Sequence, residues 1–599
     1  MQASGLQISL GNAGKITLET TPGSAQALSQ LQLRFPLAER VSAFGISMEL
    51  GHFIANVSAL ASWGGEVRWT GDAAQIVRNV LEESRYLDAV LDGLGPVPSL
   101  DMTQLTLEAH GNWVGPMTDF QLNNVAHLLN EHHGANFSVP GAGKTRTTLA
   151  AYSLLKARGE VDRLIIVAPK SAHSSWLEEL SVVYETLPTV EVISSSTLAE
   201  AEIKILNYER LPSFRNTLAI SLNAHRTLLV LDEAHRMKRG AAGAYGAICL
   251  SLGPLAARRM ILSGTPAPNG EQDLQSLMEF VWPGRGASLV TTTSMSSPAR
   301  FRRTYVRTTK LDLDLPPVNA VIRRVPLPPL HRRLYDALVG QFAAEVTANE
   351  NIEDLGRVIV YLLMAATSPA LLSVGSSRWE ALQFQVPPLA APVGSRIRSL
   401  LSELPAHEIS PKMLEVVRIV KENAAEGKKT LVWSTFLRNA SSLFELLRPY
   451  NPSLVTGKSS DEDRSDALNA FRTDPACLVL ISNPATLGEG VSLHMVCHDA
   501  VYLDRDFAAG RFLQSIDRIH RLGLLPGQET KVTILVAEDT IDDIVTRRLE
   551  TKLLYMDRVL DDPALRKLAD LDEDRETGPI VDPTDRDAVW NYLGWPSNT

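Results

Sequence analysis

The stretch that decides the fold of this 599-residue chain is Ser138-Val-Pro-Gly-Ala-Gly-Lys-Thr145. Gly141 and Gly143 allow the backbone to turn its N–H groups onto phosphate oxygens, and Lys144 adds a positive charge. A helix-like run follows at once, so its N-terminus faces the same phosphates. A Gly-rich turn before an ordinary helix is the alternative, but it does not explain the placing of Lys144 and Thr145. The segment predicts a nucleotide-phosphate loop, with the Thr145 hydroxyl as a Mg²⁺ ligand.

A pair of carboxylates comes next along the chain, in Asp232-Glu-Ala-His235. It directly follows the apolar run 228–231, so the pair lies at the C-terminal end of a buried strand, where open α/β sheets bind ligands. Asp232 is expected to hold Mg²⁺, and Glu233 to orient and deprotonate the attacking water. Taken alone, the tetrapeptide is equally typical of a solvated helix start. Its position after a phosphate loop favours catalysis.

Short apolar runs around these two motifs alternate with helix-length amphipathic stretches. Uninterrupted apolar runs are typical of strands that are buried on both faces, as in a parallel sheet covered by helices. They form two clusters, one between about 135 and 265 and one between about 430 and 537, which predicts an α/β fold with two separate parallel sheets. The runs are 164–168, 228–231, 260–262, 430–433, 478–481, 500–503 and 532–536.

Positive charge for the transition state of hydrolysis is expected from the second cluster. The segment Gln514–Arg521 places Arg518 and Arg521 three residues apart, on one face of an expected helix. Arginines that a second lobe donates act as fingers, so hydrolysis would require the two lobes to close. The alternative is an exposed basic helix face with Asp517 as a salt-bridge partner.

The chain divides into five expected parts. They are a small α+β accessory domain (1–110), a first lobe (111–305), a connector with a helical protrusion (306–408), a second lobe (409–552) and an acidic tail (553–599). A helix is expected at 73–93 and a loop near 375–400. The net charge of −10 lies at the ends: residues 1–110 hold 6 Lys/Arg and 11 Asp/Glu, and the tail holds 5 and 11. The nearly neutral centre is therefore compatible with nucleic acid.

Other compositional features exclude several classes of protein. No apolar run reaches the length of a transmembrane helix, and the N-terminus lacks the form of a signal peptide. The three cysteines form neither a zinc pattern nor a disulfide framework, so we expect a cytoplasmic protein. The pair His132-His133 has no Cys or carboxylate pattern beside it and is interpreted as a loop pair. Trp63, Trp69 and Trp113 are expected in the core rather than in a base-stacking platform.

An ordered series of motifs between about Met117 and Lys552 resembles that of superfamily-two helicases, with the Swi/Snf branch as the nearest match. The general motifs are Gln121, SVPGAGKT, APK (168–170), ILNYE (205–209), DEAH, SGTP (263–266), LVWSTF (431–436), LGEGVSL (487–493) and QSIDRIHR. The branch-specific segments are RRTYVRTTKLDLDLPP (302–317), LHRRLYDAL (330–338), LLMAATSPALL (362–372), SPKMLEVVRIV (410–420) and TIDDIVTRRLETK (540–552).

The resemblance implies two RecA-like lobes with ATP and Mg²⁺ in the cleft, and a double-stranded DNA track across both. It makes Gln121 the adenine-recognising residue and gives Lys144, Asp232, Glu233 and the two arginines the roles above. Ser263 and Thr265 would couple hydrolysis to the grip on DNA. The remaining matched positions would contact the DNA backbone or the lobe interface: Lys170, Thr435, Gly490 and Ser492.

Some departures from the family pattern concern DNA contacts more than hydrolysis. The residues before the phosphate loop lack the usual Asp-Glu pair and Gly-Leu-Gly, and Leu487 and Ser492 replace the first Gly and the Asn of motif V. A compact, prokaryotic type of member is expected, which works in repair, chromosome maintenance or defence against foreign DNA. The first domain or the tail, with Trp590 and Trp595, could bind a protein partner.

Two other functions stay open on the sequence alone. One is a helicase that separates DNA or RNA strands, although no wedge element is evident. The other is a nucleotide-switched recruitment subunit of a nuclease or methylase complex, whose lobes would bind ATP and DNA without sustained turnover. Intact Glu233, Arg518 and Arg521 favour turnover.

Overall fold

The computed structural model describes residues 5–11, 14–93, 112–193, 200–294, 298–348, 352–380, 382, 384–403, 409–487, 491–525, 527–560, 562 and 565. The chain forms two compact units, Met1–Thr309 and Lys310–Thr599, and each is described by itself. The expected sites in the tail, including Trp590 and Trp595, lie outside the described residues.

The N-terminal part of the first unit is an α+β domain, as predicted. Its five-stranded sheet has the order β3-β4-β2-β1-β5, antiparallel except for the parallel pair β1–β5. Alternate side chains of the central strands point into the core, which is why Leu6, Ile8, Ile16 and Leu18 are fully buried. The elements are β1 (Leu6–Leu10), β2 (Lys15–Thr20), α1 (Ala25–Gln32), β3 (Glu39–Ser42), β4 (Gly45–Glu49), α2 (Leu50–Ala55), β5 (Val67–Thr70) and α3 (Ala73–Leu91).

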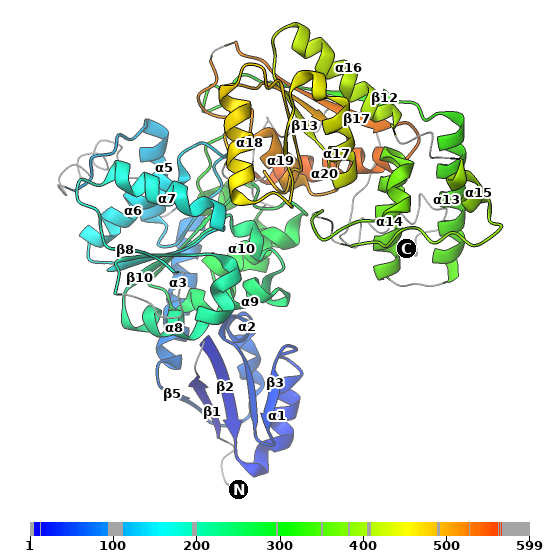
Figure 1. Cartoon of the computed structure of the whole chain (residues 1–599). Coiled ribbons are helices and arrows are strands. Elements are labelled where there is room, and N and C mark those ends of the chain that lie inside the picture. Colours follow the sequence, from blue (N-terminus) through cyan, green and yellow to red (C-terminus); the bar gives the residue numbers. More distant parts are fainter. Residues whose placement is uncertain are drawn as a thin grey trace. The chain divides into compact units, whose positions relative to one another are not determined.

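Helix α3, close to the predicted range 73–93, packs against the first lobe along its acidic face (Figure 1). Carboxylates at three levels of this helix pair with arginines of the lobe, and its last turn accepts a further bond through a backbone carbonyl. The contacts are Glu83–Arg259, Asp88–Arg285, Asp92–Arg300 and Arg303 to the Leu91 oxygen. Buried apolar residues beneath α3 add to this contact, so the small domain and the lobe share one packed interface.

The first lobe is built on a six-stranded, all-parallel sheet of order β6-β11-β10-β7-β9-β8. Helices cover it, so that strand β10 is buried along its whole length. The strands are β6 (Gly134–Asn136), β7 (Arg163–Val167), β8 (Val190–Val192), β9 (Ile203–Leu206), β10 (Thr227–Asp232) and β11 (Arg258–Leu262). The main helices are α5 (Asp119–Asn130), α6 (Lys144–Ala157), α7 (His173–Val183), α8 (Leu211–Ala224), α9 (Ala244–Leu252) and α10 (Glu271–Val281).

The second unit contains a second six-stranded parallel sheet, of order β12-β17-β16-β13-β15-β14. Two RecA-like parallel sheets in separate lobes confirm the predicted fold class. The strands are β12 (Val318–Val325), β13 (Thr430–Trp433), β14 (Ser453–Val455), β15 (Val479–Ser482), β16 (Asp499–Tyr502) and β17 (Thr530–Ala537). The main helices of the lobe are α16 (Pro411–Ala425), α17 (Leu437–Leu446), α18 (Asp461–Thr473), α19 (Ala509–Ile516) and α20 (Ile541–Leu560).

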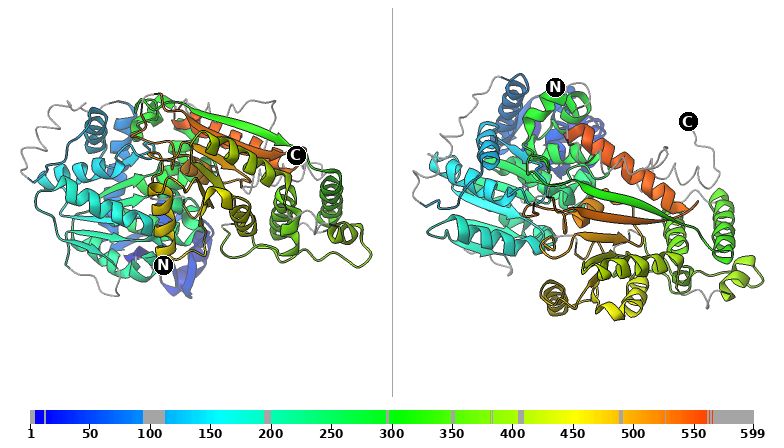
Figure 2. Two further views of the ribbon diagram at one scale, coloured as in Figure 1. Left: turned by 45° about the horizontal axis from the view of Figure 1, so that its top comes forward. Right: turned by 90° about the horizontal axis from the view of Figure 1, so that it is seen from above.

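The range 306–408, expected as connector and protrusion, is more mixed than the sequence indicated. Residues 306–308 remain with the first lobe, where Val306 bridges to Asn136. Strand β12 then pairs with β17 over eight residues, and Figure 2 shows the green strand beside the orange one. The helical protrusion follows as α13 (Pro329–Ala348), α14 (Ile352–Thr367) and α15 (Arg396–Ser402). The segment between α14 and α15 holds a short 3-10 helix, Pro369–Ser373, and then a long loop.

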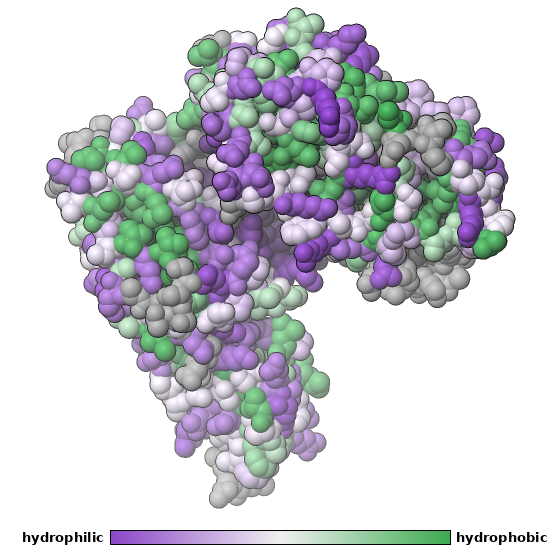
Figure 3. All heavy atoms as spheres, viewed as in Figure 1, coloured by the Kyte–Doolittle hydropathy of each residue, from purple (hydrophilic) through white to green (hydrophobic). Residues whose placement is uncertain are grey.

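The surface of the first lobe carries one group of exposed apolar side chains, over α7 and the segment after it, where Figure 3 shows hydrophobic atoms. It consists of Leu177, Val182, Leu187 and Val192. Among the described residues, no helix is both long and apolar enough to cross a membrane. The three cysteines are unpaired and buried.

Candidate active site

The phosphate loop lies between β6 and α6, in the conformation that its glycines predict. Gly141 and Gly143 have φ angles of +90° and +75°, a region that side-chain-bearing residues rarely adopt. The Lys144 ammonium donates to the backbone oxygen of Ser138 at 2.9 Å, which holds the side chain over the loop. Thr145 is the second residue of α6. The loop thus presents an ammonium, a hydroxyl and a helix N-terminus to one point, as phosphate and Mg²⁺ require.

Gln121 packs directly against this loop. It is 8% exposed and sits in the first turn of α5, where its side-chain oxygen accepts from the Thr118 amide at 3.1 Å in a capping box. A Cβ added at Gly143 would lie only 2.2 Å from the Gln121 amide nitrogen. Gly143 is therefore required both for its φ angle and for this close approach. Adenine recognition by Gln121 stays a prediction.

Asp232 closes strand β10 and is held from three sides. Its carboxylate accepts from the Trp176 indole and from the Glu233 amide, both at 2.9 Å, and its backbone oxygen accepts from the Tyr208 hydroxyl at 2.8 Å. Burial and the neighbouring charge of Glu233 raise the pKa of Asp232 to about 6, against the opposing effects of Trp176 and Lys144. The ionised carboxylate is disfavoured here by burial and by the charge of Glu233, and a cation bound beside the phosphate loop would offset both effects. A raised pKa of this kind is typical of functional sites.

Glu233 follows in a strained backbone conformation. Its φ and ψ of 47° and 50° place a residue with a long side chain in the left-handed region. Such strain costs on the order of 1 kcal/mol and is found where a side chain must point in a particular direction. The carboxylate lies 3.3 Å from the His235 ring and is partly exposed. This half-open carboxylate beside Asp232 is suited to accept a proton from water.

Ser263 and Thr265 lie after β11, at the same edge of the sheet. The Ser263 amide donates to the Asn136 oxygen at 3.1 Å, and the Thr265 amide to the Ser263 hydroxyl at 3.2 Å. A Cβ at Gly264 would come within 2.9 Å of Pro140. The motif therefore touches the phosphate loop, and the buried Thr265 hydroxyl has no hydrogen-bond partner among the described residues. The Ser263–Thr265 motif is therefore placed to respond to what the phosphate loop binds.

Lys170 stands apart from this group. It is exposed at the start of a 3-10 helix, Lys170–Ala172, which follows β7. Its position at the carboxyl-terminal edge of the sheet is compatible with a contact to a nucleic acid backbone. The structure thus brings together nine of the predicted residues of the first lobe and leaves Lys170 on the rim; the nine are Gln121, Gly141, Gly143, Lys144, Thr145, Asp232, Glu233, Ser263 and Thr265.

The donor set fits Mg²⁺ with a nucleotide triphosphate. Thr145 offers a hydroxyl and Asp232 a carboxylate, which are oxygen ligands of the kind that Mg²⁺ prefers beside substrate phosphates. The positive charge of Lys144 acts to lower the pKa of Asp232, against the effect of burial. No more than two protein ligands are needed, because the remaining positions belong to water and phosphate.

Two residues that support the loop were not found from the sequence. The Thr308 amide donates to the Ser138 hydroxyl at 2.9 Å, and the Asn124 side chain donates to the Thr308 hydroxyl at the same distance. Both contacts join segments about 170 or more positions apart in the chain, so no local pattern indicates them. Thr308 lies within the basic segment 302–317 that resembles the family's.

In the second unit, Thr435 lies at the carboxyl end of β13. Its amide donates to the Asp504 carboxylate at 2.6 Å, and the Ser434 hydroxyl donates to the other oxygen at 3.0 Å. The Asn483 side chain holds the Thr435 backbone oxygen at 2.8 Å. Asp504 was missed from the sequence, although it stands directly after a buried apolar run, the same signal that identified Asp232.

Arg518 and Arg521 do not lie on a helix, contrary to the sequence-based expectation. Helix α19 ends at Ile516, and both arginines are in the turns after it. The Arg518 guanidinium donates to the Gln514 oxygen at 2.8 Å, the carbonyl that would accept the next helical bond, and also to the Val491 oxygen at 2.9 Å. This side chain competes with the backbone and ends the helix.

Arg521 contacts the hydroxyl of Ser492. The two expected arginines are thereby joined to motif V, which brings Ser492 into the same cluster. Gly490, the remaining predicted residue of this motif, lies outside the described residues. Burial lowers the pKa of Arg521, but a guanidinium stays charged at neutral pH.

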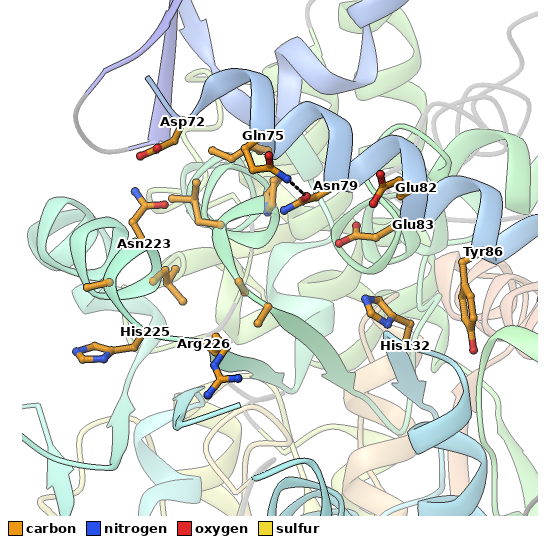
Figure 4. A pocket seen from close by; sticks show the side chains of 17 residues that line it. Asp72, Gln75, Asn79, Glu82, Glu83, Tyr86, His132, Asn223, His225 and Arg226 are labelled. Atoms are coloured by element: carbon orange, nitrogen blue, oxygen red, sulfur yellow. Dashed lines mark hydrogen bonds between the residues drawn. The ribbon is translucent and has the colours of Figure 1, made fainter. Parts of the chain in front are cut away.

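A separate cavity of about 720 Å³ lies between α3 and the opposite edge of the first sheet. Figure 4 shows Gln75, Asn79 and Glu82 on α3, across from His225 and Arg226. The cavity is polar on both walls. It is distant in the fold from the phosphate loop, because its residues precede β10 and β11 instead of following them.

Ligand atoms of Glu83, His132 and His133 lie within 4.8 Å of one another, a spacing that could hold a metal ion, and the first two of these residues line the cavity. The chemistry does not fit. The Arg259 amide donates to the His133 Nδ1 at 3.2 Å, its Nε2 faces Glu83 at 3.1 Å, and the Arg259 guanidinium pairs with the same carboxylate. Burial lowers the pKa of His132 to about 4. The sequence did not indicate Glu83 as a partner of the two histidines. In the structure its carboxylate forms an ion pair with Arg259.

Two parallel sheets, with a phosphate loop and an Asp-Glu pair at the carboxyl-terminal edge of the first, define the class of two-lobed, helicase-like ATPases. The SNF2-related domain family matches residues 123–366, and the helicase conserved C-terminal domain family matches residues 411–523. This chain therefore belongs to the Swi/Snf group of superfamily-two, helicase-like ATPases.

Relatives in the same group are distant in sequence. The human "SWI/SNF-related matrix-associated actin-dependent regulator of chromatin subfamily A member 1" is 22% identical over 476 residues, which cover 73% of this chain and 43% of the relative. The "Chromodomain-helicase-DNA-binding protein 1-like" of Danio rerio is 24% identical over 518 residues, covering 80% and 47%. The chain thus spans less than half the length of these relatives.

A solved structure, "Sulfolobus solfataricus SWI2/SNF2 ATPase core in complex with dsDNA", is 20% identical, with a TM-score of 0.32 and coverage of 77% of this chain and 98% of the other.

Proposed function

We propose that this protein hydrolyses ATP and uses the energy to move along double-stranded DNA or to remodel complexes bound to it. The observation that carries the proposal is the phosphate loop with Asp232 and Glu233, joined through Gly264 and Pro140 to the Ser263–Thr265 motif. A loop that senses phosphate and a motif that touches it are what coupling of hydrolysis to movement requires.

In the proposed reaction, Lys144 and the loop amides bind the β- and γ-phosphates, and Glu233 takes a proton from the attacking water. Mg²⁺, held by Thr145 and Asp232, supplies charge neutralisation when it is bound. Arg518 and Arg521 are assigned to the charge of the transition state, as fingers of the second lobe. Arg521 contacts the Ser492 hydroxyl and Arg518 donates to the Val491 oxygen, which supports this assignment because both arginines are joined to motif V.

Double-stranded DNA as the track rests on family membership and on the printed names of relatives such as the "Chromodomain-helicase-DNA-binding protein 1-like" of Danio rerio. The near-neutral balance of residues 111–552 is compatible with it. A cytoplasmic site of action, and a role in repair or in defence against foreign DNA, belong to the same proposal and rest on sequence alone.

The deciding experiment measures the ATPase rate of the purified chain with no nucleic acid, single-stranded DNA, duplex DNA and RNA. We expect the strongest stimulation with duplex DNA. Displacement of a third strand from a triplex, without unwinding of a forked duplex, is the expected sign of translocation. No stimulation by duplex DNA would contradict the proposal, and unwinding of the fork would replace the translocase by a strand-separating helicase.

A further inference from the structure

One tryptophan differs from the others in its exposure. Among the tryptophans that the structure describes, Trp379 alone is exposed, at 40%, in the loop between the 3-10 helix Pro369–Ser373 and α15. The Arg378 guanidinium lies over its ring, 4.5 Å from the centroid. The loop belongs to the second unit and is drawn in yellow-green in Figure 1. An exposed indole stacked by a cation is a common form of a binding surface.

The loop is fixed by the residue after this pair. Glu380 is only 5% exposed, and one of its oxygens accepts from the Leu437 amide at 2.9 Å while the other accepts from the Ser377 amide. Helix α17 begins at Leu437 without a cap from its own N-cap side chain, so Glu380 supplies the missing acceptor from a distant segment. The bonds of the buried Glu380 carboxylate fix the backbone of the loop next to Arg378 and Trp379, whose side chains are exposed. This fixed loop and the start of α17 are called the support below.

The support lies at the carboxyl-terminal edge of the second sheet. Leu437 follows β13 and comes two residues after Thr435. On the other side, a Cβ at Gly457 would lie 2.7 Å from the Trp379 oxygen, so the loop packs against the turn after β14. That turn exposes Lys458. Lys458 directly follows Gly457, so Arg378, Trp379 and Lys458 lie on segments that pack together. These segments lie at the edge that carries Thr435, which the family resemblance places at the DNA backbone or the lobe interface.

We propose that Arg378 and Trp379 form a contact to the DNA track, which nothing in the motif series assigns. The inference rests on the proposed function. Arg378 and Lys458 suit phosphate oxygens, and the face of Trp379 suits a sugar or an exposed base. A protein partner would also suit an exposed tryptophan, but Arg378 over its ring and the exposed Lys458 in the neighbouring turn favour a polyanion.

The test uses the full chain with Arg378→Ala and Trp379→Ala. Arg448→Ala is the matched control, since Arg448 is an exposed arginine of the same lobe that pairs with Glu445. Two quantities are measured: the Kd for a labelled blunt duplex, by anisotropy over a range of salt, and the duplex concentration that gives half-maximal ATPase stimulation. The ATPase rate without DNA serves as the check on folding.

Each of the two variants is expected to raise the Kd and the half-saturating duplex concentration about 5- to 10-fold, at the low end of what loss of an aromatic stacking contact costs. Arg378→Ala should also lower the salt dependence by about one counterion. The rate without DNA should not change, and Arg448→Ala should match the wild type.

Wild-type duplex binding with unchanged values in both variants would overturn this inference and leave the proposed function intact. That result is also the one expected if the pair docks a protein. If the wild type neither binds duplex nor is stimulated by it, the proposed function falls, and this inference falls with it.

Discussion

Strands β10 and β16 occupy the same place, third from one edge, in two parallel sheets whose strands follow the same order along the chain. An aspartate stands at the carboxyl end of each strand: Asp232 is the last residue of β10, and Asp504 comes two residues after β16 ends at Tyr502. In the first lobe the aspartate stands beside the phosphate loop. In the second, Asp504 is occupied by the Ser434 hydroxyl and the Thr435 amide.

The difference lies in the next residue. Glu233 is partly exposed in a strained conformation, whereas Arg505 is buried and donates to the Thr546 hydroxyl at 2.7 Å. In the first lobe the residue after the aspartate is therefore a carboxylate that water can reach. In the second lobe the residue at the same position, Arg505, contacts α20. A shared fold supplies the edge where chemistry can take place, and the residues at that edge, among them the phosphate loop and the residue after the aspartate, set what happens there.

The largest effect is expected from Glu233→Gln. The amide cannot accept a proton from water, so kcat should fall by about 10²- to 10⁴-fold, the usual contribution of a general base. ATP binding, measured with a fluorescent nucleotide, should be retained. Glu178→Gln, a change at an exposed carboxylate of α7, serves as the control. Hydrolysis that survives Glu233→Gln would contradict the assignment of Glu233 as the general base, and with it the contrast drawn between Glu233 and Arg505.

A large loss of stability is expected in the second lobe from Lys412→Met. Lys412 and Asp542 form a buried ion pair, and removing one partner leaves an uncompensated charge, which costs about 3–5 kcal/mol. Urea unfolding measures it. The double variant Lys412→Met/Asp542→Asn should regain most of the loss, because Asn keeps the acceptor for the Ala537 amide. No regain would show that packing of the lysine stem, and not charge, holds the pair.

A pH effect is expected from Asp232. With a raised pKa of about 6, Asp232 loses its charge as the pH falls through 6, so the Mg²⁺ concentration for half-maximal ATPase should rise below that pH. The Trp176 indole favours the charged form. Trp176→Phe should therefore move this acid limb upward, by about one pH unit if the bond has the usual strength of one to a charged group. If Trp176→Phe leaves the acid limb of the pH profile unchanged, that limb belongs to the titration of a group other than Asp232.

The smallest effect is expected from Asp504→Asn. An amide oxygen can still accept from the Thr435 amide, and the Ser434 hydroxyl can turn to accept in its place. The ATPase rate with duplex DNA should fall less than about 5-fold, the effect of roughly one altered hydrogen bond. The matched change Asp232→Asn puts an NH₂ group against the Trp176 indole or removes a metal ligand, and should abolish the Mg²⁺-dependent rate.

Much of this site could be predicted from the sequence, because its parts are local. The phosphate loop and the Asp-Glu pair are short motifs beside buried strands, and the strand predicted at 430–433 has the observed bounds. Strands β8 and β14 have three residues each, too few for a pattern. Strand β12 lies at a sheet edge, and its two arginines hide its apolar alternation.

What could not be predicted depends on contacts between distant segments. Glu83 reaches Arg259 and His133 across the fold, and the Arg518 side chain ends a helix that its own sequence favours. Glu380 caps a helix 57 positions away. None of these contacts produces a periodic pattern in the sequence. From the sequence alone, each of the charged side chains involved is expected to point into solvent, whereas in the structure it bonds to a distant segment or to the backbone.

The docking of α3 limits how this protein can be taken apart. Arg259 is fully buried in β11, and Glu83 of the N-terminal domain is its carboxylate partner. A chain that begins after α3 would leave that guanidinium without its counter-charge, and would also remove the carboxylate that faces the His133 ring. The first 93 residues are therefore not an exchangeable appendage. A graft of this motor onto another targeting domain must keep α3 together with the small sheet, because β5, which precedes α3, pairs with β1.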